Sequence, residues 1–174
     1  MRHKFEYMCR IELLKPCGGS HFRREGRIVD MEDESTIIEK MKAIILEKAK
    51  GISSEKVVEY GTNPDHYGVI DNPDGYACGK GDCGENLEMF LSVRDGMIEK
   101  AKFIAGGCMF TIAACNAAAK MAQGRKIREC LAINRSSILT HLEKLPADHA
   151  HCALLAARLF QKALRDYMAK RRRE

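Results

Sequence analysis

No segment of the sequence is apolar enough to cross a bilayer, which takes roughly 18 or more consecutive apolar residues. The N-terminus also lacks the apolar stretch of a secretory signal, because charged residues are scattered through it. It carries Glu6 and Glu12, whereas organellar transit peptides are poor in acidic residues. We therefore expect a cytoplasmic protein that has no membrane among its partners.

The sequence also lacks the Cys-x-x-Cys pairs of zinc fingers, although it contains 8 cysteines. Cytoplasmic thiols are kept reduced, so disulfide bonds are disfavoured. We expect these cysteines to be metal ligands, reactive thiols or core residues instead. The length of 174 residues, with 45% hydrophobic residues, is sufficient for one domain with a buried core.

The N-terminal part of the chain divides into two regions of different character. Residues 1–30 contain Pro16 and several glycines without a clear hydrophobic period, so we expect an extension that is disordered or not native, with Met31 as an alternative start. Residues 31–51 carry apolar side chains at helical spacing and predict an amphipathic helix. The main domain is then expected over residues 52–174.

The middle of the chain has the pattern of β-strands. Apolar and polar residues alternate over 87–94, Asp95 and Gly96 form a two-residue hairpin turn, and 97–105 returns with a bulge expected near Ile98. The preceding segment, TNPDHYGVIDNPDGY, contains Asn-Pro-Asp twice and predicts turns.

Helices are expected after the strands. An alanine-rich segment from Cys108 to Gly124 is apolar on nearly all sides and predicts a buried helix. Two short helices follow, and a last helix is expected from about His149 to Arg171, with Asp148 as its N-cap. Strands followed by helices indicate an α+β fold, a small antiparallel sheet of about three strands with helices packed on one side.

Three cysteines are distinguished by their positions. Cys108 and Cys152 fall at the starts of two expected helices, where free N–H groups and the helix dipole favour a thiolate, the form that binds metals. Cys83 precedes a strand, and Glu85 would point the same way about 7 Å further along extended backbone. Three thiolates with an oxygen or imidazole ligand suit Zn²⁺ or the iron of an iron–sulfur cluster. The alternative for Cys108 and Cys152 is a small buried hydrophobic residue.

The remaining cysteines and histidines receive weaker assignments. Cys115 and Cys130 fall within helices and are expected in the core. Cys78 falls in a glycine-rich loop, where it could be a reserve ligand or a sulfur acceptor. His149 and His151 share a loop-to-helix junction, and His151, next to Cys152, is the better candidate ligand.

Three segments follow one another in a recognisable order: SSEKVVEYGTNPDHYGVIDNPDGYA, CGENLEMFLSVRDGMIEKAKFIAGGC and LPADHAHCALLAARLFQKALRDY. Together, over roughly residues 52–170, they resemble the IscU/NifU-type family of scaffolds for iron–sulfur cluster assembly, with a SufE/NifU-like fold. The resemblance implies a scaffold or sulfur acceptor rather than an enzyme. It also implies two partners, a cysteine desulfurase and the acceptor apoproteins that receive the cluster.

The resemblance also implies a ligand set. Cys83, Glu85, Cys108 and Cys152 would hold a transient [2Fe–2S] cluster or iron, with zinc in the isolated form, and His151 would exchange as a ligand. The family usually has aspartate where this chain has Glu85. One branch carries a Leu-Pro-Pro-Val-Lys motif that an Hsp70-type chaperone recognises; here the segment is LPADHAHC, so the resemblance does not extend to that partner.

Two other functions remain open at the level of sequence. The protein could be a zinc-bound persulfide acceptor that relays sulfur from a cysteine desulfurase. A basic module with structural zinc would instead use the net charge of +5 and the arginines at 171–173 to bind nucleic acid. We rank this last, because it leaves the cysteines at helix starts unexplained and a basic helix end also suits the helix dipole.

Overall fold

The computed structural model describes residues 34–81 and 84–173, so the predictions for residues 1–30 and for Cys83 lie outside the described residues. The elements follow in the order α1 (Glu34–Ile52), α2 (Glu55–Thr62), β1 (Gly75–Lys80), β2 (Asn86–Arg94), β3 (Met97–Ala105), α3 (Met109–Ala122), α4 (Ile127–Cys130), α5 (Arg135–Leu142), the 3-10 turn η1 (Ala147–His149) and α6 (Ala150–Arg171). Within the described ranges no helix combines the length and apolar character that a membrane crossing requires.

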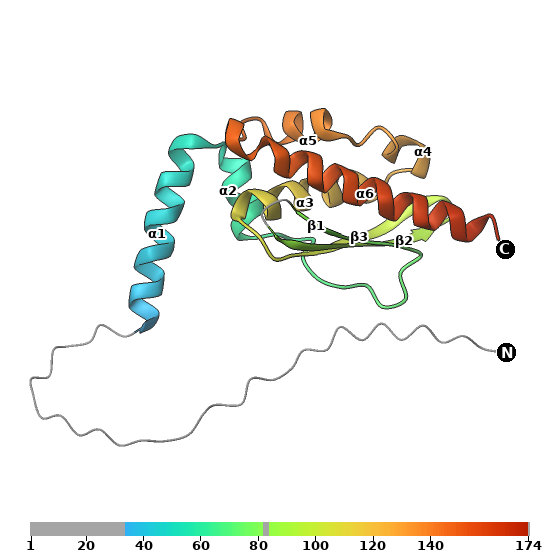
Figure 1. The fold of residues 1–174 in the computed structure, drawn as a ribbon, viewed down its shortest axis with the longest axis horizontal. Coiled ribbons are helices and arrows are strands. Elements are labelled where there is room, and N and C mark those ends of the chain that lie inside the picture. The colour runs from blue at the N-terminus through green and yellow to red at the C-terminus, as the bar shows by residue number, and fades with distance from the viewer. Residues whose placement is uncertain (1–33, 82–83, 174) are drawn as a thin grey trace, which may run out of the picture.

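The three strands form one antiparallel sheet in the order β1-β2-β3, helices α3 and α6 pack on one side of it, and α2 packs against α3 (Figure 1). This confirms the predicted α+β class. The β2–β3 hairpin turns at Asp95 and Gly96, which have positive φ angles of 52° and 73° as this turn type requires. The pairing register shifts between Ser92 and Val93, which pair with Lys100 and Ile98, and this is the bulge expected near Ile98.

The core lies between the sheet and the helices. The alternating residues of β2, Leu87, Met89 and Leu91, are at most 1% exposed, and Phe103 of β3 packs with them. Helix α3 is buried on nearly all sides because the sheet, α2 and α6 surround it, and its alanines let these neighbours approach closely. The two cysteines assigned to the core, Cys115 and Cys130, are both fully buried.

Strand β1 corrects the prediction of a glycine loop around Cys78, and it takes in Gly75 and Tyr76, the last two residues of the segment predicted to form turns. Cys78 lies within β1 and pairs with Glu88 of β2. The strand escaped detection because glycine and small residues replace the usual alternation of large apolar side chains. At Gly75 this is required by packing, since a Cβ there would approach the Ala163 carbonyl oxygen of α6 to 2.6 Å.

The start of α6 corrects the predicted cap. Asp148 makes no capping hydrogen bond; it lies inside η1, which the bond from His149 N–H to the Pro146 carbonyl closes at 2.9 Å. His149 occupies the N-cap position of α6, and the helix itself begins at Ala150. The single 3-10 turn brings His149 to the same end of the helix as Cys152.

Candidate metal centre

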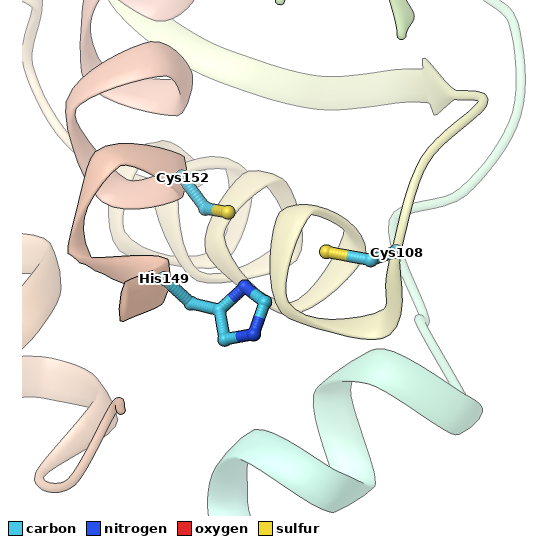
Figure 2. A group of neighbouring side chains, drawn as sticks. All are labelled: Cys108, His149 and Cys152. Atoms are coloured by element: carbon cyan, nitrogen blue, oxygen red, sulfur yellow. The ribbon is translucent and has the colours of Figure 1, made fainter. Parts of the chain in front are cut away.

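Two helix starts meet at one end of the sheet and each contributes a cysteine. Cys108 is the N-cap residue of α3, with extended backbone (φ −70°, ψ 162°), and its carbonyl accepts the N–H of Thr111 at 3.0 Å. Cys152 lies in the first turn of α6. Figure 2 shows the two sulfurs facing each other with the ring of His149 beside them. Sulfur atoms of Cys108 and Cys152 and a ring nitrogen of His149 all lie within 4.8 Å of one another.

A buried hydroxyl lies between the two sulfurs. Thr111 is fully buried; its Oγ1 donates to Cys152 Sγ at 3.3 Å and lies 3.5 Å from Cys108 Sγ. The sequence analysis missed this residue. Its spacing of one helical turn from Cys108 is the signal that could have revealed it, because residues three apart share a helix face.

The two thiols differ in exposure and in proton affinity. Cys108 is exposed, and the hydrogen bond from the Cys152 thiol, supported by Thr111, lowers the pKa of Cys108 to about 4. Cys152 is fully buried, and its bond to the Cys108 thiolate, followed by desolvation, raises the pKa of Cys152. In the metal-free chain one proton is therefore shared by this pair, with the negative charge on Cys108. By contrast, burial raises the pKa of Cys115 to about 12.

Two histidines flank the thiols in different ways. The ring of His149 stacks on Phe110 with a centroid distance of 4.1 Å and an angle of 28°, and its Nδ1 is buried without a hydrogen-bond partner among the described residues. His151 is exposed; its Nδ1 lies 2.9 Å from the Asp148 carbonyl and its Nε2 lies 3.5 Å from Cys152 Sγ. His151, the histidine for which we predict a ligand role, thus contacts Cys152 but lies outside the group of three.

Glu85 lies between two glycines near the thiols. A Cβ on Gly81 would collide with Glu85 Oε2, and a Cβ on Gly107 would lie 2.8 Å from Glu85 Cγ, so both positions must stay small. In the part of the chain that the structure describes, Oε2 is buried and has no hydrogen-bond partner, and the carboxylate charge contributes to the raised pKa of Cys152. Glu85 is not in the group of three. Cys83 lies outside the described residues, so the ligand roles of both remain predictions.

The donor set of this region suits a transition metal. Thiolates and imidazoles are typical ligands of zinc and iron, and a carboxylate can complete a four-coordinate site. A buried carboxylate oxygen without a partner is costly unless a cation or donor satisfies it. The residues present therefore fit zinc, iron or an iron–sulfur cluster.

A small α+β domain with two thiols and an imidazole grouped at two helix starts is an arrangement that can bind a metal with soft ligands. Comparison with known proteins identifies the family within that class. The sequence model of the NifU-like N terminal domain matches residues 52–174, so the chain belongs to this family.

Relatives and solved structures agree with this assignment. The iron-sulfur cluster assembly scaffold protein IscU 1 of Archaeoglobus fulgidus is 36% identical over 118 residues, which is 67% of this chain and 77% of the relative. The scaffold protein IscU of Escherichia coli K12 is 34% identical over 123 residues, covering 68% of this chain and 95% of the relative. The N-terminal part of a nitrogen-fixing NifU-like protein from Brucella abortus superposes with a TM-score of 0.57 at 18% identity, over 67% of this chain and 94% of that one. That structure supports the fold alone.

Proposed function

We propose that the protein is a scaffold on which iron–sulfur clusters are assembled and from which they are transferred. One observation carries the proposal: the sulfurs of Cys108 and Cys152 face each other at two helix starts, with a ring nitrogen of His149 within 4.8 Å of both. The names of the relatives, which are cluster assembly scaffolds, support the same function. The nascent cluster is cargo, so the protein acts as a holder and has no turnover chemistry of its own.

The resemblance to the family supplies the rest of the ligand set. We propose that Cys83, Glu85, Cys108 and Cys152 hold a transient [2Fe–2S] cluster or iron, with zinc bound in the isolated protein. In this set His151 exchanges with one of them. Thiolates hold iron firmly, whereas a carboxylate is a harder and less well matched ligand. Glu85 would therefore be the arm that releases first when the cluster leaves.

The proposed function requires partners that this chain does not contain. A cysteine desulfurase would deliver sulfane sulfur as a persulfide on one thiolate. Each sulfane sulfur needs two electrons to become sulfide, so a separate electron donor is required together with an iron source. Acceptor apoproteins would then receive the finished cluster. These steps would take place in the cytoplasm, where thiols stay reduced.

The decisive experiment is anaerobic reconstitution of the full chain with ferrous iron, cysteine, a cysteine desulfurase and dithiothreitol as the electron donor. We expect a coloured protein in which iron and acid-labile sulfide are present in equal amounts. We also expect that the cluster passes to an apo-ferredoxin. Failure to form a cluster in the wild-type chain would remove the scaffold function.

The role of Glu85 has its own test. Glu85→Ala is expected to change both the lifetime of the reconstituted cluster and its rate of transfer to the apo-ferredoxin. Glu85→Asp, which shortens the side chain by one methylene, is the matched control and should retain cluster formation. Unchanged lifetime and transfer in Glu85→Ala would show that the carboxylate is not the labile arm.

A second function is favoured by the exposure of Cys108 beside a compact nitrogen and sulfur donor set. With zinc bound, the same site could accept sulfane sulfur from a desulfurase and relay it without building a cluster. In that case the purified protein would contain stable zinc and would stimulate the desulfurase. It would remain colourless after reconstitution.

A further inference from the structure

We propose that a groove along α6 docks an acidic, amphipathic helix of a partner protein. The groove lies between α6 and residues 126–135, which contain α4 and the first residue of α5 (Figure 1). None of the residues that line it belongs to the metal centre, so the inference does not depend on the proposed function. Four observations on the described residues support it.

The first observation is the shape of this surface. Two hollows follow one another along α6, and Leu131 lines both of them. The hollow of about 550 Å³ lies between α4 and the C-terminal end of α6, and the hollow of about 280 Å³ lies between residues 131–135 and the middle of α6. From Leu154 to Met168 the helix rises about 21 Å, so the combined groove has the length of about four turns of a docked helix.

The second observation is the charge of the two walls. The cationic residues that line the hollows include Lys126, Arg128, Arg135, Arg158, Arg165 and Arg172. Within the described ranges none of these six has an ion-pair partner, and the only carboxylate side chain that lines either hollow is that of Asp95. The three arginines of the α6 wall are spaced seven residues apart, so they project from one side of the helix axis. The groove is therefore complementary to a negatively charged partner.

The third observation is that the groove is already formed in the free chain. The side-chain amide of Gln161, in the middle of α6, donates to three carbonyls of the turn after α4, those of Cys130, Leu131 and Ile133, at 3.3, 3.2 and 2.8 Å. These bonds fix the turn to α6 and hold the side chain of Leu131 out between the two hollows, where it is 49% exposed. A surface that is ordered in advance loses little conformational entropy when a partner binds.

The fourth observation is the apolar floor between the cations, which decides the kind of partner. Ile127, Leu154 and Met168 are half-buried along the groove and flank the exposed Leu131. A nucleic acid binds through its phosphates and stacked bases, so it would pair with the arginines but leave this aliphatic surface uncovered. A helix with leucine-type anchors on one face and carboxylates beside them would cover the floor and pair with the arginines.

The test measures binding of a synthetic peptide to the full chain by fluorescence anisotropy. The probe is a labelled peptide about four turns long, with leucines at helical spacing on one face and glutamates elsewhere. At physiological ionic strength we expect saturable binding that weakens as salt is added. Two control peptides, one with serine for leucine and one with lysine for glutamate, should each bind at least about tenfold more weakly.

Variants of the groove should weaken binding of the glutamate–leucine peptide. Arg158→Glu combined with Arg165→Glu should lower affinity by about tenfold or more, because attraction becomes repulsion at two positions. Leu131→Ser should lower it by about fivefold, since an apolar anchor of the floor is lost. The matched control, Lys48→Glu combined with Lys100→Glu, makes the same change of charge on exposed residues outside the groove and should leave affinity within about twofold.

A measurement on the wild type makes the test independent of how well the variants fold. In a spectrum of the ¹⁵N-labelled chain, the peptide should shift backbone amide signals of residues 126–135 and 154–172. Amide signals of the opposite face of the sheet should stay in place. Zinc affinity should be the same with and without the groove variants.

Three results would overturn the proposal. Absence of saturable binding to the wild type would remove the docking site, and equal binding of the serine peptide would show that the apolar floor takes no part. Binding of an oligouridylate that is tighter than that of the peptide, and lost in the double arginine variant, would make the groove a nucleic-acid surface instead. Cluster assembly by the wild-type chain is measured separately, so the two proposals can fail independently.

Discussion

The two ends of the three-stranded sheet, where strands connect to helices, differ in how well their polar groups are hydrogen-bonded. At the hairpin end, backbone hydrogen bonds join β3 to the segment that precedes α4. Ile98 N–H donates to the Arg125 carbonyl at 2.9 Å, and Gly124 N–H donates to the Ile98 carbonyl at 2.8 Å. Ile127 N–H donates to the Gly96 carbonyl at 3.0 Å. The turn and the start of α4 thereby form one hydrogen-bonded unit.

The opposite end of the sheet leaves polar atoms without partners. Across the described residues, the buried side-chain oxygen and nitrogen atoms that lack a hydrogen bond are Glu85 Oε2 and His149 Nδ1, and both belong to this end. Such atoms lower stability, because they lose water and gain nothing in return. The described part of the domain therefore has its buried, unpartnered polar atoms at the end of the sheet where a metal can satisfy them.

The largest expected effect is on zinc affinity, and it should distinguish the cysteines of the site from those of the core. Cys108→Ser should reduce zinc affinity by more than about 100-fold, since loss of a supporting residue alone commonly costs 10-fold to 100-fold. The matched control is Cys115→Ser in the same helix, which should destabilise the core by about 1–3 kcal/mol and leave zinc affinity unchanged. Zinc titration and urea unfolding measure the two quantities. Equal zinc affinity in the two variants would contradict the assignment of Cys108.

The second prediction concerns the cost of the unpartnered carboxylate. Glu85→Leu should stabilise the metal-free chain by about 1–3 kcal/mol, because it removes a buried oxygen without a partner. It should also lower metal affinity. Urea unfolding of the metal-free form gives the free energy of unfolding. If that form is destabilised instead, the carboxylate has a favourable role in the metal-free fold.

The third prediction is a pH dependence carried by the thiol pair. The folded-state pKa of Cys108, about 4, lies below the ordinary value of 9.0, so between these values the unfolded state holds more protons. The free energy of unfolding of the metal-free chain should therefore rise with pH between these two values. The contribution of the thiol pair should be lost as the pH falls toward 4. In Cys152→Ala the thiolate loses its main hydrogen-bond donor, and the dependence should weaken. Unfolding at several pH values, with alkylation rates of Cys108, provides the measurement.

The smallest effect is expected at the hairpin end. Gly96→Ala forces a side chain into a positive φ of 73°, although no neighbour lies within 4 Å, so we expect a loss of about 1 kcal/mol. Metal affinity should not change. A measurable change in zinc binding would show that the two ends of the sheet are coupled.

The parts of the fold that could be predicted are those in which apolar residues repeat regularly. Strand β2 alternates Leu87, Met89 and Leu91, and α3 is apolar on every side, so burial determines both. Strand β1 could not be recognised, because the close approach of α6 selects glycine at Gly75 and removes the signal.

The residues of the site also divide into those that could be predicted from the sequence and those that could not. Cys108 and Cys152 could be proposed from the sequence because each occupies a helix start, which is a local property. The position of His149 beside the two sulfurs could not be predicted, because it depends on stacking with Phe110, far away in the sequence. The bridging hydroxyl of Thr111 likewise depends on how α3 and α6 meet.

A close contact between α2 and α3 limits which substitutions this chain can accept near Cys108. Gly61 of α2 lies against Met109, the first residue of α3; an added Cβ would clash with the Met109 side chain and come within 2.7 Å of its carbonyl oxygen. A methyl group at this position would press on the first turn of α3, which begins one residue after Cys108. The packing of α2 against α3 therefore helps to fix the position of the Cys108 sulfur.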